Sequence, residues 1–452
     1  MQNTADIICA IATPNGTGAI AVIRASGKGS IELVDQLFSG NLTEAQSHTL
    51  HFGTLKNERK ELIDEVLISV FHEGKSFTGE ESVEISCHAS PFIQKEILSM
   101  VLRSGARVAN SGEFTMRAFM NGKLDLSQAE AVADLIASES KASHNIALKQ
   151  LRGGFSNKLK ELREKLIHFA SMVELELDFA EEDVEFADRT ELKNLVDEVI
   201  NYITTLANSF ELGNAIKKGV PVAIVGAPNT GKSTLLNNLL GEDRAIVSNI
   251  AGTTRDVIEE TINIEGVLFR LIDTAGIRDN AEEIEALGIQ RSKEKIVQSS
   301  VVLCMSDLSV ENDLARVKSW AEEIRNEFPD KKVLIVGNKI DLSKDEASED
   351  VLVISAKEGS NIDTLKKRIV ELVVGDRDLD QDIIVNNSRH YEALLRTRDA
   401  LIKAQNGLVS GVTGDFVAMD IRQAMFHLGS ITGDISTDDL LGNIFSKFCI
   451  GK

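Results

Sequence analysis

The feature that most constrains the fold is the glycine-rich segment Gly226-Ala-Pro-Asn-Thr-Gly-Lys-Ser233, which fits the phosphate-loop pattern G-x-x-x-x-G-K-[ST] at every fixed position. An apolar run at residues 220–225 precedes it and predicts a buried strand, and residues 234–240 open a helix. This context is typical of an α/β domain with a mostly parallel sheet. The backbone N–H groups of such a loop surround phosphates, Lys232 meets the β- and γ-phosphates, and the Ser233 hydroxyl can bind Mg²⁺.

Three further segments, each after an apolar run, complete the pattern of a guanine-nucleotide site. Asp273-Thr-Ala-Gly276 places a carboxylate near the metal and a glycine near the γ-phosphate. In Asn338-Lys-Ile-Asp341, the Asp341 carboxylate can accept hydrogen bonds from N1–H and the amino group of guanine, an arrangement that adenine cannot match. Ser355-Ala-Lys357 completes the base pocket. Four motifs in this order predict GTP binding.

Composition narrows the class of protein. The chain has 452 residues, of which 43% are hydrophobic and 26% charged, so we expect about three folded domains. No signal-like segment and no apolar run of about 18 residues is found, so we expect a cytoplasmic protein without a membrane span. A net charge of −21 argues against holding nucleic acid by bulk electrostatics, and a nucleic-acid substrate would need a local patch or a partner. The four cysteines are Cys9, Cys87, Cys304 and Cys449. They lie far apart in the sequence and lack the spacing of metal ligands, so we expect neither disulfides nor a zinc site.

Hydrophobic periodicity predicts a multidomain fold of class α/β + α. Residues 1–123 mix strand-like runs with one amphipathic helix and predict a small α+β domain for binding or dimerisation. The period changes to 3.6 from residue 124, where Ser127-Gln-Ala-Glu130 fits a capping box. Helical pattern covers 124–216 and returns over 379–452. The nucleotide-binding segment, residues 217–378, is therefore predicted to be a Ras-like phosphate-loop domain inserted between two halves of an all-α domain.

Two positions of the nucleotide site depart from Ras-like enzymes. A glutamine directly after the Asp273–Gly276 motif would orient the attacking water, but Ile277 occupies that position. Either hydrolysis is slow or another polar group takes this role, and the candidates are Arg278, Glu282, Glu283 and Glu285. Asn229 in the phosphate loop is the second departure, because its amide oxygen could bind a cation against the phosphates and do the work of an arginine finger.

Several segments are more specific than the nucleotide motifs. These segments are Ala251-Gly-Thr-Thr-Arg-Asp256, Asn121-Gly-Lys-Leu-Asp-Leu126 and Phe448-Cys-Ile-Gly-Lys452. The insertion of the nucleotide-binding segment between two helical halves is a further specific feature. In these features the whole chain resembles the MnmE (TrmE) family of tRNA-modification GTPases. One departure is His88-Ala-Ser-Pro91, where the family pattern has His-Gly-Gly-Pro, and it puts the local backbone shape beside Glu84 in doubt.

The resemblance implies a GTP hydrolase that acts with the flavoprotein MnmG (GidA). Together they would install an aminomethyl or carboxymethylaminomethyl group at C5 of the wobble uridine (U34) of certain tRNAs. The implied cofactors are GTP, Mg²⁺, K⁺ and a reduced folate as one-carbon donor, either 5-formyl- or 5,10-methylene-tetrahydrofolate, with no flavin in this chain. The resemblance also implies a homodimer formed through the N-terminal domain, a heterotetramer with MnmG, and tRNA reached mainly through that partner. The alternative is a GTP-dependent switch in ribosome assembly.

The resemblance assigns roles to individual residues. Glu285 would orient the attacking water, and Cys449 would take part in the modification chemistry. Folate would contact Arg24, Glu84, Lys123 and Lys452. Mg²⁺ would be bound by Ser233 and Thr254, and K⁺ by Asn229, Ser248, Ile250 and Thr253. The GTP-binding set is Asn229, Thr230, Gly231, Lys232, Ser233, Thr234, Ser248, Asn249, Ile250, Ala251, Gly252, Thr253, Thr254, Asp273, Thr274, Ala275, Gly276, Asn338, Lys339, Asp341, Ser355, Ala356 and Lys357.

From the residues alone, the folate and thiol assignments have simpler alternatives. Arg24 and Lys123 would be surface charges, and Glu84 an outward-facing strand residue. Cys449 would be a half-buried structural thiol at the end of a short helix. We expect this helix to start in Ser436-Thr-Asp-Asp439, which offers an N-cap and an acidic first turn, and to continue through Phe448.

Overall fold

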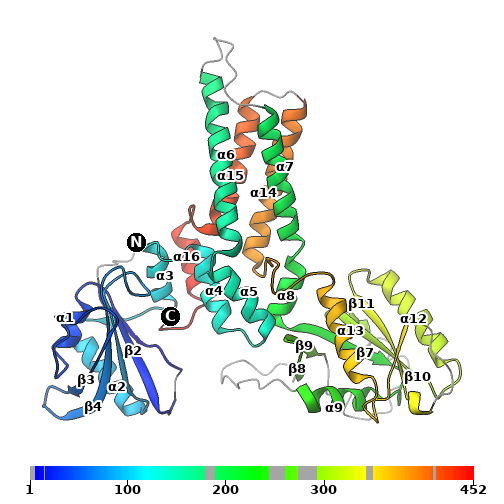
Figure 1. Ribbon diagram of the computed structural model, residues 1–452, viewed down its shortest axis with the longest axis horizontal. Helices are drawn as coiled ribbons and strands as arrows, with labels where there is room; N and C mark the ends of the chain where they lie inside the picture. Colours follow the sequence, from blue (N-terminus) through cyan, green and yellow to red (C-terminus); the bar gives the residue numbers. More distant parts are fainter. Residues whose placement is uncertain are drawn as a thin grey trace. The chain divides into compact units, whose positions relative to one another are not determined.

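A computed structural model of the chain describes residues 6–14, 16–178, 189–243, 260–272, 293–342, 350–410 and 414–451. The chain divides into two compact units. Figure 1 labels their helices and strands in colours that follow the sequence. The first unit comprises Met1–Ala133, Gln150–Arg189 and Gly407–Lys452. The second comprises Asp134–Lys149 and Thr190–Asn406.

The first unit contains a six-stranded sheet with the order β3-β4-β5-β2-β1-β6. Neighbouring strands are antiparallel, except that β1 and β6 are parallel. The strands are β1 (Ile8–Ile11), β2 (Ile20–Ser26), β3 (Thr49–Lys56), β4 (Leu62–Phe71), β5 (Ser82–His88) and β6 (Arg107–Val108). The strands predicted near residues 7–11, 19–23, 66–71 and 82–86 are confirmed, whereas β3 and β6 were not anticipated.

The two faces of this sheet are covered by different helices, α1 (Ser30–Asp35) and α2 (Pro91–Arg103) on one and α3 (Glu113–Met120) on the other. Ile23, Ile85 and the α2 residue Ile97 belong to the larger core. Ala10 of β1 packs with Phe114 of α3 in a separate cluster. Because side chains alternate along a strand, every second residue of β1 and β2 faces α3.

The first long helical segment starts differently from the sequence prediction. α4 (Leu126–Ile136) is capped by Asp125, whose carboxylate accepts a hydrogen bond from the backbone N–H of Gln128 at 2.9 Å. The Gln128 side chain accepts one from the N–H of Asp125, also at 2.9 Å. The capping box is therefore Asp125 with Gln128, and its prediction at Ser127 and Glu130 is wrong. The helix begins at Leu126, and both Leu126 and Ser127 are fully buried.

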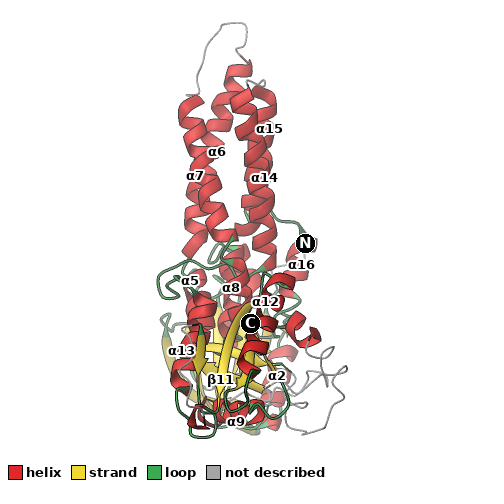
Figure 2. Ribbon diagram, turned by 90° about the vertical axis from the view of Figure 1, so that its right-hand side faces the viewer, coloured by secondary structure: helices red, strands yellow, loops and turns green. Residues whose placement is uncertain are grey.

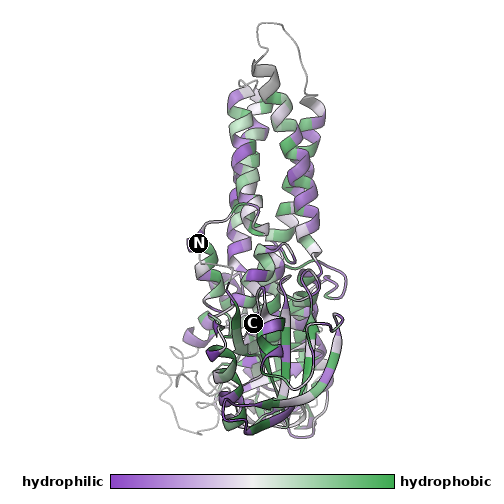
Figure 3. Ribbon diagram, turned by 90° about the vertical axis from the view of Figure 1, so that its left-hand side faces the viewer, coloured by the Kyte–Doolittle hydropathy of each residue, from purple (hydrophilic) through white to green (hydrophobic). Residues whose placement is uncertain are grey.

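The remaining helices of the first unit include α6 (Gly154–Asp178) and α15 (Gly414–Thr432), which pack against each other. Hydrophobic and hydrophilic residues alternate along the long helices (Figure 3), as the 3.6-residue period predicted. The last helix, α16 (Asp438–Phe445), has Thr437 as its N-cap, as expected. It ends at Phe445, three residues earlier than predicted, because the N–H of Phe448 bonds to the carbonyl of Phe445 in a turn.

The second unit contains a six-stranded sheet with the order β12-β11-β10-β7-β9-β8. All neighbouring strands are parallel except β8, which is antiparallel to β9. The strands are β7 (Val220–Gly226), β8 (Glu260–Ile264), β9 (Val267–Leu271), β10 (Val301–Asp307), β11 (Lys332–Asn338) and β12 (Val351–Val353). The mostly parallel sheet is confirmed, and its predicted strands are found at β7, β9, β11 and β12, whereas β8 and β10 were not anticipated.

Both faces of this sheet are buried, which explains the uninterrupted apolar runs in the sequence. One face packs against α9 (Lys232–Asp243) and α13 (Ile362–Val374), and the other against α12 (Asp313–Glu327). Figure 2 shows these helices around the yellow strands. The other α-helices in the described part of this unit are α5 (Lys141–Leu151), α7 (Arg189–Ala207), α8 (Phe210–Lys218) and α14 (Ser388–Ser410). Within the described ranges, we find no helix with the length and hydropathy that crossing a membrane requires.

Candidate functional site

The predicted phosphate loop connects the carboxyl end of β7 to the first turn of α9. Gly226 lies beside Met305 of the neighbouring strand β10, and a Cβ atom there would be 2.5 Å from the Met305 carbonyl oxygen. Asn229 is exposed and has a φ of +62°, in the left-handed region. Close backbone approach and left-handed turns allow a loop to direct its N–H groups inward. The segment therefore has the backbone shape that a phosphate cradle needs.

Lys232 is the first residue of α9, and its side chain reaches back to the start of the loop. Its Nζ atom donates hydrogen bonds to the carbonyl oxygens of Gly226, at 3.0 Å, and Ala227, at 2.7 Å. Burial, together with the positive charge of Lys295, lowers the pKa of Lys232. The ammonium group would gain from a negative charge nearby, because a partly desolvated cation is stabilised by an anion. This electrostatic environment fits a bound phosphate.

Asn338, at the end of β11, connects three of the predicted motifs. Its side-chain amide donates to the carbonyl of Thr230 in the phosphate loop at 2.7 Å. Its side-chain oxygen accepts from the backbone N–H of Ala356 at 2.9 Å. Asn338 is 2% exposed, so both bonds lie in the protein interior. The structure thus brings together the phosphate loop, the Asn338–Asp341 motif and the Ser355–Lys357 motif.

The groups predicted to recognise the base remain accessible. Asp341 lies in the short 3₁₀ helix Ile340–Leu342 and is exposed, as is Lys357. The N–H of Ile340 donates to the carbonyl of Ile354 at 3.2 Å, which fixes this turn against the segment that leads into Ser355. An exposed carboxylate on an anchored turn can accept hydrogen bonds from a guanine base.

Sequence reasoning missed one charged residue beside these motifs. Asp307, the last residue of β10, accepts a hydrogen bond from Lys339 Nζ at 2.5 Å and another from the Ser309 hydroxyl at 2.6 Å. Burial alone would raise the pKa of Asp307, but the hydrogen bonds from Lys339 and Ser309 hold it below its usual value. Its position at the carboxyl end of a buried strand, level with Asn338, is the signal that could have identified it.

Part of the predicted nucleotide site lies outside the described residues. These positions include the second predicted Mg²⁺ ligand, three predicted K⁺ ligands and the predicted water-orienting acid. They are Ser248, Asn249, Ile250, Ala251, Gly252, Thr253, Thr254, Asp273, Thr274, Ala275, Gly276 and Glu285, together with the alternative candidates Arg278, Glu282 and Glu283. Of the predicted metal ligands, Ser233 in the first turn of α9 and Asn229 are described.

The predicted folate residues of the first unit include an ion pair on neighbouring strands. Arg24 on β2 faces Glu84 on β5 in the antiparallel register, and the guanidinium donates to the carboxylate at 2.7 and 2.9 Å. The centre of the guanidinium lies 5.7 Å from the ring of Phe77 and 5.5 Å from that of Phe114. Both charged side chains keep part of their surface accessible, 21% and 28% respectively. A paired charge between aromatic rings suits a planar polar ligand.

The chain end approaches the same sheet. The carbonyl of Cys449 accepts a hydrogen bond from the N–H of Gly112 at 3.3 Å, directly before α3. Ile450 forms an isolated bridge with Ser111, and Gly451 has a φ of +95°. Cys449 itself is exposed. The structure therefore brings Cys449 to the α3 side of the sheet, while Lys452 lies outside the described residues.

Two further sequence predictions of this region can be placed. Lys123 is exposed, and its Nζ atom donates to the carbonyl of Gly74 at 2.8 Å. At the departure from the family pattern, Ala89 and Ser90 precede α2, and neither has a positive φ. The backbone there does not require glycine, so the two substitutions fit without strain.

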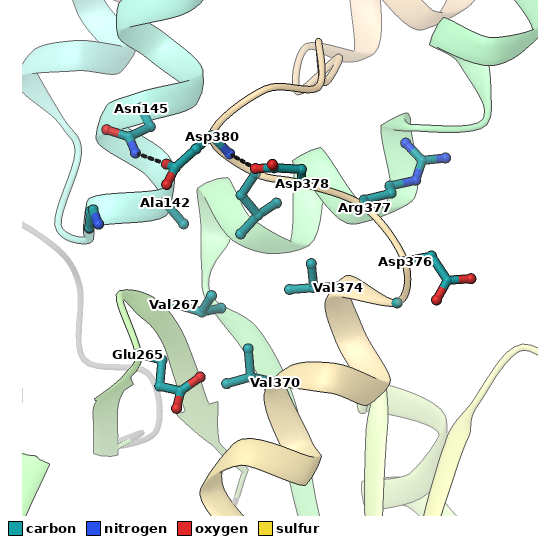
Figure 4. A pocket seen from close by; sticks show the side chains of 13 residues that line it. Ala142, Asn145, Glu265, Val267, Val370, Val374, Asp376, Arg377, Asp378 and Asp380 are labelled. Carbon is teal, nitrogen blue, oxygen red and sulfur yellow. Dashed lines mark hydrogen bonds between the residues drawn. The ribbon is translucent and has the colours of Figure 1, made fainter.

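A cavity of about 470 Å³ lies in the second unit, and no predicted site residue lines it. Its lining includes Lys141, Glu265 and the segment Gly375–Asp380 (Figure 4). Asn145 donates a hydrogen bond to Asp380 at 2.7 Å across one side. Charges of both signs surround it, so it shows no preference for a phosphate or a folate.

Two family profiles match the chain. A profile described as the GTP-binding protein TrmE N-terminus covers residues 7–123, and one described as the MnmE helical domain covers residues 126–449. Among curated proteins, one from Cytophaga hutchinsonii is 53% identical over all of this chain and 99% of its own length. Proteins from Christiangramia forsetii and Bacteroides fragilis are 50% and 49% identical, each over 99% of both chains. All three are named tRNA modification GTPase MnmE.

Proposed function

The chain belongs to the MnmE family of tRNA modification GTPases, and from this premise we propose that it couples GTP hydrolysis to the modification of a tRNA wobble uridine. A role in tRNA modification and the binding of GTP follow from the family. The bonds of Asn338 to Thr230 and Ala356 support this most directly, because they assemble the phosphate-binding and base-binding motifs at one edge of the parallel sheet.

Each predicted residue of the nucleotide site has its own role in the proposal. We propose that the loop backbone and Lys232 bind the phosphates, and that Asp341 selects guanine. Ser233, with Thr254, would hold Mg²⁺, which neutralises charge that develops on the phosphates. Asn229, with oxygens of Ser248, Ile250 and Thr253, would hold K⁺. Glu285 would orient the attacking water, because Ile277 cannot hydrogen-bond to it.

We propose that the first unit binds the one-carbon donor. Glu84 carries a carboxylate that can accept parallel N–H groups from the edge of a pterin ring, and Arg24 holds that carboxylate in place. Lys123 and Lys452 would contribute positive charge for the glutamate tail of a reduced folate. Cys449, exposed beside α3, would act in the modification chemistry.

The proposal also covers the domain organisation of the chain and its protein partner. We propose that residues 1–123 form the folate-binding and dimerisation domain and that 217–378 form a Ras-like domain inserted into the helical domain of 124–216 and 379–452. The flavoprotein MnmG would join the homodimer in a heterotetramer and present most of the tRNA surface. The net charge of −21 supports delivery of tRNA by a partner, because this chain repels polyanions.

Nucleoside analysis of tRNA tests the proposed function. A deletion strain should lack the aminomethyl-type group at C5 of the wobble uridine, and a plasmid copy of the parent gene should restore it. Unchanged wobble uridines in the deletion strain would contradict the proposal and favour the alternative role in ribosome assembly. Titration of the purified protein with 5-formyl-tetrahydrofolate, with Glu84→Gln as the comparison, tests the folate site separately.

A further inference from the structure

A buried arginine in the first unit has no part in the function proposed so far. Arg117, on α3, is 1% exposed. Its guanidinium donates to the Asp6 carboxylate at 2.7 Å, to Glu113 at 3.1 Å and to Glu80 at 3.2 Å. It also donates to the backbone carbonyl of Asp6 at 2.9 Å. One side chain therefore connects α3, the loop before β5 and the segment before β1.

The bond to Glu80 anchors the loop that carries Phe77. The Glu80 carboxylate also accepts a hydrogen bond from Ser26 at 3.1 Å, two residues after Arg24 on β2. Within the loop, the hydroxyl of Thr78 lies 2.7 Å from that of Ser26. The Arg117–Glu80 pair thereby holds the loop against the strand that carries Arg24, and Phe77 lies beside the Arg24 guanidinium.

The bond to Glu113 anchors the other side of the same site. Glu113 is 2% exposed and is the first residue of α3. Phe114, whose ring lies 5.5 Å from the centre of the Arg24 guanidinium, comes next in the sequence. Gly112, which donates to the carbonyl of Cys449, directly precedes Glu113. The position of α3 thus sets both the Phe114 ring and the contact of the chain end.

We propose that Arg117 is a positioning residue for the candidate folate site. It holds the segments of Phe77 and Phe114 at a fixed separation around the Arg24–Glu84 pair and places Gly112 to receive Cys449. This inference rests on the proposed folate function, which it deepens. Arginine suits the task because its planar guanidinium bonds several carboxylates at once, whereas a lysine ammonium concentrates its donors at one point.

The test compares Arg117→Lys with two control variants in the full-length protein. Ile97→Ala removes a fully buried side chain of α2 from the core on the opposite face of the sheet, and so destabilises the domain without touching the site. Arg107→Met removes the second cation bound to Asp6 and Glu113 but leaves the bonds of Arg117 to Glu80 in place. The probe is 5-formyl-tetrahydrofolate, titrated at a temperature where thermal unfolding shows that every variant is folded.

We expect Arg117→Lys to weaken folate binding by about tenfold to a hundredfold, as a small misplacement of a binding group can do. Ile97→Ala and Arg107→Met should each change it by less than about threefold, within the range of ordinary context effects. GTP hydrolysis without tRNA should stay unchanged in all three. Parent-like folate affinity in Arg117→Lys, or an equal loss in Ile97→Ala, would overturn the proposal.

Hydrogen exchange separates this inference from the folate proposal itself. Amides of residues 74–81 and 112–120 should exchange faster in Arg117→Lys than in Ile97→Ala, with or without ligand. If the parent protein binds no reduced folate, the folate proposal fails, and exchange alone decides whether Arg117 positions these segments. Equal exchange in both variants would reduce Arg117 to a contributor to overall stability.

Discussion

The side chain of Asn338 donates to the carbonyl of Thr230 at 2.7 Å, a bond between residues that are 108 positions apart. The same side chain accepts from the N–H of Ala356, so the asparagine sets the distance between the phosphate loop and the base-binding segment. The phosphate loop and the base-binding segment are therefore already positioned before a nucleotide binds to both. Preorganisation of this kind raises affinity because less order is lost on binding.

Asn338→Ala should therefore lower GTP affinity by about tenfold to a hundredfold, because two buried backbone groups lose their partner and the binding free energy falls by ~1.4–2.8 kcal/mol in total. The measurement is titration with a fluorescent GTP analogue. Asn145→Ala in the same unit, which removes only a surface bond to Asp380, is the control. Equal affinity in the two variants would contradict the bridging role.

Asp341→Asn should change base selectivity. The carboxylate can accept two N–H groups of guanine, whereas an amide offers one donor and one acceptor. Xanthine has a carbonyl oxygen in place of the guanine amino group and matches the amide. We expect GTP binding to fall by about 10²–10⁴-fold and xanthosine triphosphate to bind better than GTP. Unchanged preference for GTP would place base recognition elsewhere.

Asn229 should make hydrolysis depend on K⁺. Asn229→Gly removes the amide and keeps the left-handed backbone conformation, because glycine adopts a φ of +62° without strain. We expect GTP affinity to remain and K⁺-stimulated turnover to fall, by up to the roughly 10³–10⁵-fold that an arginine finger supplies. The measurement is the GTP hydrolysis rate of the parent protein and of Asn229→Gly in KCl and in NaCl. Equal turnover of the parent protein in both salts would rule out a K⁺ site.

Cys449 should be the thiol that reacts first with an alkylating agent. It is exposed, whereas burial raises the pKa of Cys9 and Cys87 to about 11 and that of Cys304 to about 12. Because the thiolate is the nucleophile, these three should react only after unfolding. Mass spectrometry after brief treatment with iodoacetamide gives the order of reaction.

Cys449→Ser should keep GTP hydrolysis and its K⁺ dependence while abolishing wobble-uridine modification. Cys87→Ser, at a buried thiol of β5, is the matched variant and should retain modification as long as the protein folds. Nucleoside analysis of tRNA from complemented deletion strains is the readout. Modification at the parent rate in Cys449→Ser would make Cys449 a structural thiol.

The ion-pair cluster around α3 should make the first unit sensitive to acid. Burial alone would raise the pKa of Glu113, but hydrogen bonds from Arg107, the Asn110 N–H and Arg117 hold it below its usual value. A lowered folded-state pKa stabilises the fold above the unfolded pKa, near ~4.3, and this stability is lost as pH falls through the folded value.

The difference in unfolding free energy between the parent and Glu113→Gln should thus be largest above about pH 5 and shrink toward about pH 3. This difference is measured by urea unfolding at each pH, monitored through the hydrogen exchange of residues 107–120. Glu161→Gln, at an exposed ion pair on α6, should show little dependence of this kind. A difference that is independent of pH would show that Glu113 acts only by packing.

Local patterns in the sequence were sufficient for the phosphate loop, the nucleotide motifs and most strands. The runs that became β7, β9, β11 and β12 are apolar throughout because helices cover both faces of their sheet. The family resemblance drawn from the motifs is confirmed by the relatives. β3 was missed because exposed and half-buried residues mix along it, which leaves little contrast between its two faces.

Contacts between distant segments decided the rest. The Asn338 bridge, the Asp307–Lys339 pair and the bond of Arg117 to Glu80 join residues that are far apart in the sequence, and each depends on where a strand or helix ends in space. The start of α4 at Leu126 is a local exception, because Asp125 caps the helix in place of the predicted Ser127. The sequence by itself thus determined the family and most of the elements, because periodicity and motif spacing are local. Only tertiary structure decided which polar side chains meet, because a buried donor takes whichever acceptor the packing places beside it.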